Sequence, residues 1–197
     1  MRVKLVHSTP DPFKLIVDIA SICYGKEEAS NPDKLMKHLY NNGHHSTFEH
    51  VHFIFKIEGI SRICLAQLTR HRHASYTVRS QRYCQEEDTE IRIPTEGLDT
   101  IEQHDLVKKA YKDALESYKV LISSGVKKED ARFVLPQGTT TELYMSFNLR
   151  ELLLIGELRT SKKAQWEIRD LVTEIVRQVL LAAPELGFML DNYTIQL

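Results

Sequence analysis

Hydrophobic residues recur at helical spacing in several segments of the chain. Asp11 before Pro12 and Asn31 before Pro32 each predict an N-cap followed by proline at the first helical position. We expect the second helix to end near residues 42–43. Further helical stripes lie at 63–70, 107–121, 152–153 and 168–179. The longest clean stripe is 107–121, which closes at Gly125, and the last one stops before Pro184.

Two shorter segments alternate between apolar and polar residues, which is typical of strands with one buried face. The first places Val51, Phe53, Phe55 and Ile57 on one face. The second runs from Leu143 through Met145 and Phe147, where a helix with a Thr139/Glu142 capping box is the alternative. We favour the strand, with Asn148 capping the helix that follows.

The order of these elements predicts an α+β protein, because helices dominate and the strands do not alternate with them as βαβ units. No repeat or Gly/Ser linker divides the chain, so we expect one helix-rich domain, residues 1–197, around a small and mainly antiparallel sheet. The longest aliphatic run, Leu152–Ile155, is too short to cross a bilayer, and we expect a cytoplasmic protein without a membrane partner. Three cysteines, an odd number, favour buried thiols over disulfides: Cys23, Cys64 and Cys84.

The charge distribution is uneven, although the net charge is only −1. Between Ser61 and Gln85 there is no Asp, Glu or Lys, yet five arginines occur: Arg62, Arg70, Arg72, Arg79 and Arg82. A guanidinium keeps its proton at any working pH and presents a fork that matches phosphate oxygens. Arginines without nearby acids therefore favour an anion site over a solvated basic face, and Ser75 and Ser80 could add hydrogen bonds.

Residues 70–83, RHRHASYTVRSQRY, resemble the signature of flavin-dependent thymidylate synthases, an RHR triplet, Ser three positions on and then Ser-x-Arg-Tyr. Three more segments resemble elements of the same family: 43–50 its GHxxxxEH, 131–136 its ARxVLP and 158–168 its LRxxxxAQWEI. Order and spacing agree over nearly the whole chain. The resemblance implies a homotetramer whose flavin lies at the junction of subunits.

The resemblance also implies site residues. Those expected to bind dUMP are Gln67, Arg70, Val78, Arg79, Ser80, Gln81, Arg82, Arg132 and Arg159. Those expected to contact FAD are Ser46, Glu49, Arg70, His71, Arg72, His73, Val78, Asn148, Arg150 and Leu154. Arg132 would reach the phosphate from another subunit. Arg159 would be the catalytic residue, facing the uracil carbonyl and N3 region, where a fixed positive charge stabilises the anionic pyrimidine.

The chemistry follows from what the sequence contains and lacks. Its eight glycines form neither GxGxxG nor GxxxxGK[ST], so phosphates must be held by side chains. No cysteine stands between Pro and His, as the nucleophile of the other thymidylate synthase family does, so substrate activation should be electrostatic. The resemblance implies FAD as bound cofactor, NADPH as reductant and methylenetetrahydrofolate as one-carbon donor. The chain departs from the family pattern on the cofactor side, at Thr77, Val78, Leu154 and Lys163.

Three alternatives remain open. Six of the nine histidines fall between His44 and His73, but His45, Glu49 and His50 do not form a tight ligand set such as HExxH, and we expect no metal. An arginine-rich nucleic-acid module could stack bases on tyrosines, although the acids after Gln85 oppose an extended phosphate track. A homologous flavoenzyme that hydroxymethylates the nucleotide is the closest rival. Trp166 is expected to pack in the core rather than against flavin.

Overall fold

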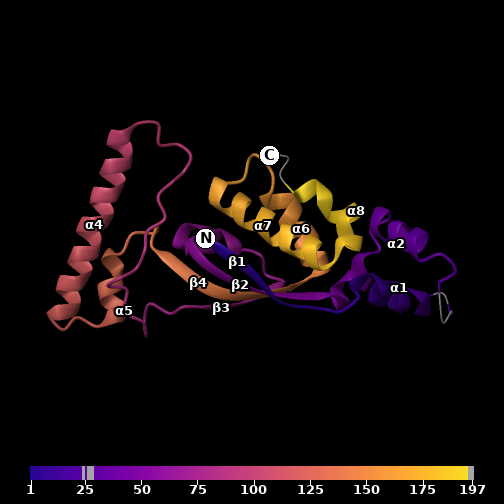
Figure 1. The fold of residues 1–197 in the computed structure, drawn as a ribbon. Coiled ribbons are helices and arrows are strands. Elements are labelled where there is room, and N and C mark those ends of the chain that lie inside the picture. The colour runs from indigo at the N-terminus through magenta and orange to yellow at the C-terminus, as the bar shows by residue number, and fades with distance from the viewer. Residues whose placement is uncertain (24, 26–28, 195–197) are drawn as a thin grey trace. The chain divides into compact units, whose positions relative to one another are not determined.

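The computed structural model describes residues 1–23, 25 and 29–194, and its contacts divide the chain into two compact units (Figure 1). Unit 1 contains Met1–Arg2, Ile57–Leu68 and Thr77–Leu143. Unit 2 contains Val3–Lys56, Thr69–Tyr76 and the chain from Tyr144 onward. Residues 24, 26–28 and 195–197 of the expected single domain lie outside the described residues, and the single domain itself stays a prediction.

A four-stranded sheet runs through both units in the order β1-β2-β4-β3. Backbone N–H groups of Thr9 and Leu149 donate to the carbonyls of His52 and Val51, and Arg62 donates to Thr139. In these pairs one residue number rises as the other falls, so β1, β2 and β4 are antiparallel neighbours. The strands span Arg2–Ser8 (β1), His52–Ser61 (β2), Ala74–Val78 (β3) and Thr140–Asn148 (β4). The predicted α+β class with a small antiparallel sheet is confirmed.

Both predicted strands exist, and their apolar faces are buried as expected. Phe53, Phe55 and Ile57 of β2 are fully buried, as is Met145 of β4. The rings of Phe55 and Phe147 stack with centroids 5.7 Å apart and planes 6° apart. Cross-strand aromatic contacts of this kind stabilise a sheet beyond the area they bury. The pattern did not predict β1, nor β3 within the arginine-rich segment.

The helices of unit 2 follow the predicted start signals. α1 begins at Pro12 and α2 at Pro32, and the Asn31 side chain accepts from the Lys34 N–H at 2.9 Å. Asp11 is the N-cap residue of α1 as predicted, but it has φ 43°, a left-handed conformation, and its side chain makes no cap bond. α6 packs against α7, as Figure 1 shows. The bounds are Pro12–Ile22 (α1), Pro32–Asn41 (α2), His45–His50 (η1), Leu149–Arg159 (α6), Trp166–Ala182 (α7), Pro184–Leu186 (η3), Gly187–Leu190 (α8) and Asp191–Tyr193 (η4).

Unit 1 contains the longest helix, α4, which begins at Ile101, six residues before its apolar stripe, because Thr100 and Gln103 form a capping box. Every residue of α4 is described, and of these only Tyr118 is buried. α3 ends at Leu68, so Arg70, the last residue of the helical stripe predicted at 63–70, lies outside the helix. The bounds are Arg62–Leu68 (α3), Ile101–Ser123 (α4), Lys128–Ala131 (α5) and Arg132–Val134 (η2).

The remaining expectations on burial are mixed. Cys64 and Trp166 are buried as predicted, whereas Cys84 is half-buried. The prediction for Cys23 is wrong: this thiol is exposed, directly after the last residue of α1. Within the described part of the chain, no helix combines the length and the apolar character that a membrane crossing requires.

Candidate functional site

A pocket of about 870 Å³ lies in unit 2 and gathers half of the residues expected to contact FAD. It is lined by the first turn of α6, the end of η1 and the turn before β3. Arg150 forms an ion pair with Glu49 across it, and the Asn148 Oδ1 accepts from the Glu151 N–H at 2.9 Å, capping α6. Its lining residues are Tyr40, Asn41, His45, Glu49, His73, Asn148, Arg150, Glu151, Leu153, Leu154, Glu157 and Tyr193.

One side of this pocket is an aromatic wall, formed by Tyr40, His45 and Tyr193, that sequence reasoning missed. The rings of Tyr40 and His45 are stacked with centroids 5.9 Å apart. The pKa of Tyr193 is raised to about 12, by burial and then by the charge of Tyr40 and a hydrogen bond with its side chain. Gly156 of α6 lets the Tyr193 ring approach, since a Cβ there would lie 2.6 Å from Cδ2. No local motif marks these residues, because they come from three separate segments.

A polar cluster of four residues lies in unit 2, and one of its members also lines the pocket. The four are His71, Tyr76, Arg159 and the pocket residue Glu151. His71 and Glu151 are each only 4% exposed, with His71 Nδ1 3.5 Å from Glu151 Oε1. The Arg159 Nε donates to His71 Nε2 at 2.9 Å. The Tyr76 hydroxyl donates to the His71 carbonyl at 3.0 Å. The cluster therefore connects the turn that contains Arg70, His71 and Arg72 with β3 and with both ends of α6.

Burial perturbs the titration of this cluster. The pKa of His71 is lowered to about 4, by burial first and by the positive charge of Arg159 second. Burial also raises the pKa of the Glu151 carboxyl, against a smaller opposing effect of His73. The pKa of Tyr76 is raised by burial and by the charge of Glu151. His71 is consequently a neutral imidazole at physiological pH.

The other residues expected to contact FAD are placed differently. Ser46, in η1, and Arg70 and Arg72, in the turn after α3, are exposed parts of unit 2. His71 is buried. Val78 ends β3 and belongs to unit 1. As the structure describes it, the lining of the 870 Å³ pocket does not include these five.

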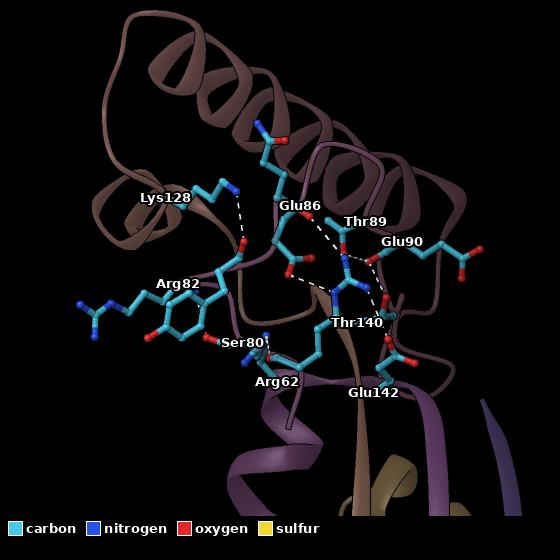
Figure 2. A network of polar contacts seen from close by, with 12 residues as sticks. Arg62, Ser80, Arg82, Glu86, Thr89, Glu90, Lys128, Thr140 and Glu142 are labelled. Atoms are coloured by element: carbon cyan, nitrogen blue, oxygen red, sulfur yellow. Dashed lines mark hydrogen bonds and ion pairs between the residues drawn. The ribbon is translucent and has the colours of Figure 1, made fainter. Parts of the chain in front are cut away.

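In unit 1 the arginines have acidic partners that local sequence did not reveal. Arg79 Nε lies 3.6 Å from Glu86 Oε1, and its Nη1 lies 3.4 Å from Glu142 Oε1 (Figure 2). Glu86 is 3% exposed, and its N–H donates to the Tyr118 hydroxyl at 3.3 Å. The acid-free stretch therefore does not leave its arginines without carboxylates, because Glu142 approaches through the pairing of β4 with β3.

A second arginine, Arg62, lies within this charge network, although the family resemblance gave it no role. Its Nη2 donates to the Arg79 carbonyl at 3.3 Å. Its pKa is lowered by burial, raised by Glu86, and lowered again by Arg132 and Arg79. Arg62 and Arg79 therefore share the buried Glu86 carboxylate as a countercharge. The place of Arg62 in the acid-free stretch was the only sequence signal.

Arg82 and Arg132 meet at Glu129. The Arg82 Nε lies 2.7 Å from the Glu129 carboxylate, and the Arg132 Nε donates to the Glu129 carbonyl at 3.0 Å. Both side chains belong to unit 1, and the Ser80 Oγ accepts from the Arg82 N–H at 3.2 Å (Figure 2). Two predicted phosphate-binding arginines are therefore close to each other within one chain.

The residues expected to bind dUMP are divided between the units. Arg70 and Arg159 belong to unit 2. Unit 1 holds the other seven, which are Gln67, Val78, Arg79, Ser80, Gln81, Arg82 and Arg132. Within unit 1 the contacts above connect Ser80 and Arg132 through Arg82, whereas Gln67, at the end of α3, is half-buried.

A polar pocket with an aromatic wall and an arginine cluster on an α+β framework are typical of proteins that bind anionic cofactors or nucleotides. A family model described as "Thymidylate synthase complementing protein" matches residues 4–185, and the chain belongs to this family. It is 36% identical over 195 residues to the "Flavin-dependent thymidylate synthase" of Geobacter sulfurreducens, covering 93% of this chain and 84% of the relative. It is 40% identical over 192 residues to the protein of the same name from Pyrococcus furiosus, covering 91% and 79%.

Proposed function

We propose that the chain is a flavin-dependent thymidylate synthase, which converts dUMP to dTMP with methylenetetrahydrofolate as one-carbon donor, NADPH as reductant and FAD as bound cofactor. The names of the relatives support the flavin and the thymidylate product. The observation that carries the proposal is the 870 Å³ pocket, because five residues assigned to FAD by sequence line it. A homotetramer with shared sites is part of the same proposal.

The pocket residues fit FAD in size and in chemistry. A volume of 870 Å³ falls within the roughly 300–1,000 Å³ usual for cofactor and ligand pockets. Arg150 supplies a fixed positive charge for the pyrophosphate, and Leu153 and Leu154 supply apolar surface for a ring system. The α6 cap uses Oδ1 of Asn148, so its Nδ2 donors can serve the cofactor. Bound there, FAD would supply the hydride that completes the methyl group.

The chain would contribute electrostatic activation through Arg159. This side chain ends α6 and is half-buried, and the imidazole to which its Nε donates is neutral. A guanidinium held against the uracil carbonyl would stabilise negative charge on the pyrimidine, which increases electron density at the reacting carbon. In this proposal no cysteine attacks the nucleotide.

Arg82 and Arg132 would bind the nucleotide phosphate. Their shared anchor, Glu129, fixes two guanidinium groups beside each other, and Ser80 adds a hydroxyl at the same place. Charge-assisted bonds from two guanidiniums to one phosphate are roughly twice as strong as neutral hydrogen bonds. Breaking the ion pair between Arg82 and Glu129 to bind a phosphate would cost little free energy, because the Arg82 side chain is 60% exposed.

The deciding experiment is an anaerobic assay with dUMP, methylenetetrahydrofolate, NADPH and FAD, in which the nucleotide product is identified by mass spectrometry. We expect dTMP, formed only when all four are present. Leu154, apolar where relatives can place Asn, lines the same pocket, and this departure keeps the hydroxymethylase as second candidate. A hydroxymethyl product would establish that candidate, and the absence of any modified nucleotide would reject both.

A paired substitution tests the cofactor pocket separately. Arg150→Ala removes the pocket cation and should weaken FAD binding at least tenfold in an absorbance titration. Arg177→Ala is the matched control, since Arg177 is a similarly exposed arginine of unit 2 in its own ion pair with Glu174, away from the pocket. Equal FAD affinity in both variants would show that Arg150 does not contribute to FAD binding.

A further inference from the structure

The backbone of Arg79, the residue directly after β3, is fixed from two sides. Its N–H donates to the Glu142 carbonyl at 2.9 Å, which attaches it to β4. Its own carbonyl accepts from Arg62 Nη2 at 3.3 Å (Figure 2). Arg79 is therefore a fixed starting point for the residues that follow, which include the proposed phosphate ligands Ser80 and Arg82.

Residues 80–84 form a compact turn after this point. The N–H groups of Tyr83 and Cys84 both donate to the Ser80 carbonyl, at 3.3 and 2.9 Å. The Lys128 Nζ donates to the Tyr83 carbonyl at 3.1 Å (Figure 2). The turn is thus closed by its own backbone bonds and attached to the first residue of α5 by one side chain.

The Arg79 side chain connects the two ends of this turn. Its Nη2 donates to the carbonyl of Gln85, the residue after the turn, at 3.4 Å. Its Nη1 donates to Glu142 Oε1 at 3.4 Å, and its Nε lies 3.6 Å from Glu86 Oε1. Each of the three guanidinium nitrogens therefore has a partner in the chain, and one planar group bonds the end of the turn and β4 together.

These contacts bear on Arg79, for which the family resemblance implies contact with dUMP. We propose that Arg79 is a positioning residue, which closes the turn and so holds Ser80 and Arg82 in place for the phosphate of dUMP. The inference rests on the proposed function, because the turn matters for affinity only if it binds the nucleotide. A segment that is already held in its binding conformation avoids the cost of ordering it when the ligand binds.

The test compares Glu142→Leu with Glu142→Gln, in dUMP titrations by calorimetry with FAD present. Both changes remove the same charge, but only glutamine keeps an oxygen for Arg79 Nη1, and neither creates a cavity because Glu142 is 40% exposed. We expect Kd for dUMP to be about 3- to 10-fold higher in Glu142→Leu than in Glu142→Gln. A phosphate-binding Arg79 would instead lose a competing carboxylate in both variants, which would leave their Kd equal.

Kinetics and a double variant complete this test. At saturating dUMP, kcat should stay within about threefold of the parent, because the turn would affect binding and the activating Arg159 belongs to the other unit. Arg79→Met should raise Kd for dUMP about tenfold. Adding Glu142→Leu to it should change Kd less than about twofold, since both substitutions act through one contact. Glu116→Leu, at an exposed position of α4, is the control and should match the parent.

Hydrogen exchange without nucleotide gives a readout that does not depend on the substrate. The N–H groups of Arg82 and Cys84, which donate to Ser80 Oγ and to its carbonyl, should exchange at least about threefold faster in Arg79→Met and no faster in Glu116→Leu.

Three results would overturn the inference: equal Kd in the two Glu142 variants, additive effects of Arg79→Met and Glu142→Leu, or unchanged exchange in folded Arg79→Met. If Arg79→Met does not fold, the two Glu142 variants decide. If no protein binds dUMP, the parent included, while exchange is faster in Arg79→Met, the proposed function is rejected and closure of the turn by Arg79 stands.

Discussion

Replacing Arg159 by alanine should separate catalysis from folding. The change removes the Nε bond to His71 and a cation at the C-terminus of α6. A hydrogen bond to a charged group contributes about 1.5–3 kcal/mol, and a cation at a helix C-terminus adds about 0.3–1 kcal/mol. We expect a loss of about 2–4 kcal/mol in unfolding free energy, which a domain with a stability of roughly 5–15 kcal/mol tolerates.

The kinetic effect should be larger. Loss of one group that stabilises developing negative charge typically reduces kcat by about 10²–10³-fold. Anaerobic dTMP formation and urea unfolding should be measured on the same preparations of Arg159→Ala and Arg159→Lys. Lysine keeps the charge without the planar fork, so its kcat should lie between those of alanine and the parent. Near-normal turnover by a folded Arg159→Ala protein would refute the activating role.

Three other expectations follow from single contacts. The His71 imidazole should titrate in proton NMR with a pKa of about 4, below its ordinary value of 6.5, so the free energy of unfolding should decrease as the pH falls from 6.5 to about 4. A pKa near 6.5 would contradict its buried, neutral state. Gly156→Ala should displace the Tyr193 ring and weaken FAD binding several-fold in a fluorescence titration. Unchanged FAD affinity would show that this ring does not contribute to the FAD site. Glu86→Gln should lower the free energy of unfolding measured in urea by about 1–3 kcal/mol, whereas the exposed control Glu116→Gln should lower it by less than about 0.5 kcal/mol. Equal stability of the two variants would contradict the role of Glu86 as a buried countercharge for Arg79.

Local patterns predicted the parts of the fold that depend on neighbours in sequence. Pro12 and Pro32 mark helix starts because proline is already restricted to helical φ, and Asn148 caps α6 through a donor three residues on. β1 was missed because a strand at the edge of a sheet needs a partner that only tertiary structure supplies. The apolar stripe of α4 gave its helix but not its environment, since only Tyr118 is buried.

The candidate site depends even more than the fold on contacts between segments that are distant in sequence. Sequence found Glu49, Asn148 and Arg150, which the structure gathers in one pocket from two segments about 100 residues apart. It missed Tyr40 and Tyr193, because ring stacking between distant segments leaves no spacing to detect. The absence of acids from the segment between Ser61 and Gln85 did not predict which arginines lack ion pairs, because the pairing of β3 with β4 brings Glu142 next to Arg79, and ion pairs depend on distance in space.

The length of α6 fixes a dimension of the proposed enzyme. Arg150 lies in its first turn and Arg159 at its last residue. At a rise of about 1.5 Å per residue, the two Cα atoms are separated along the axis by roughly 13–14 Å. Inserting or deleting one residue between them would rotate one guanidinium by about 100° relative to the other. Loops elsewhere can change length without this penalty, so variation within α6 should be confined to substitutions.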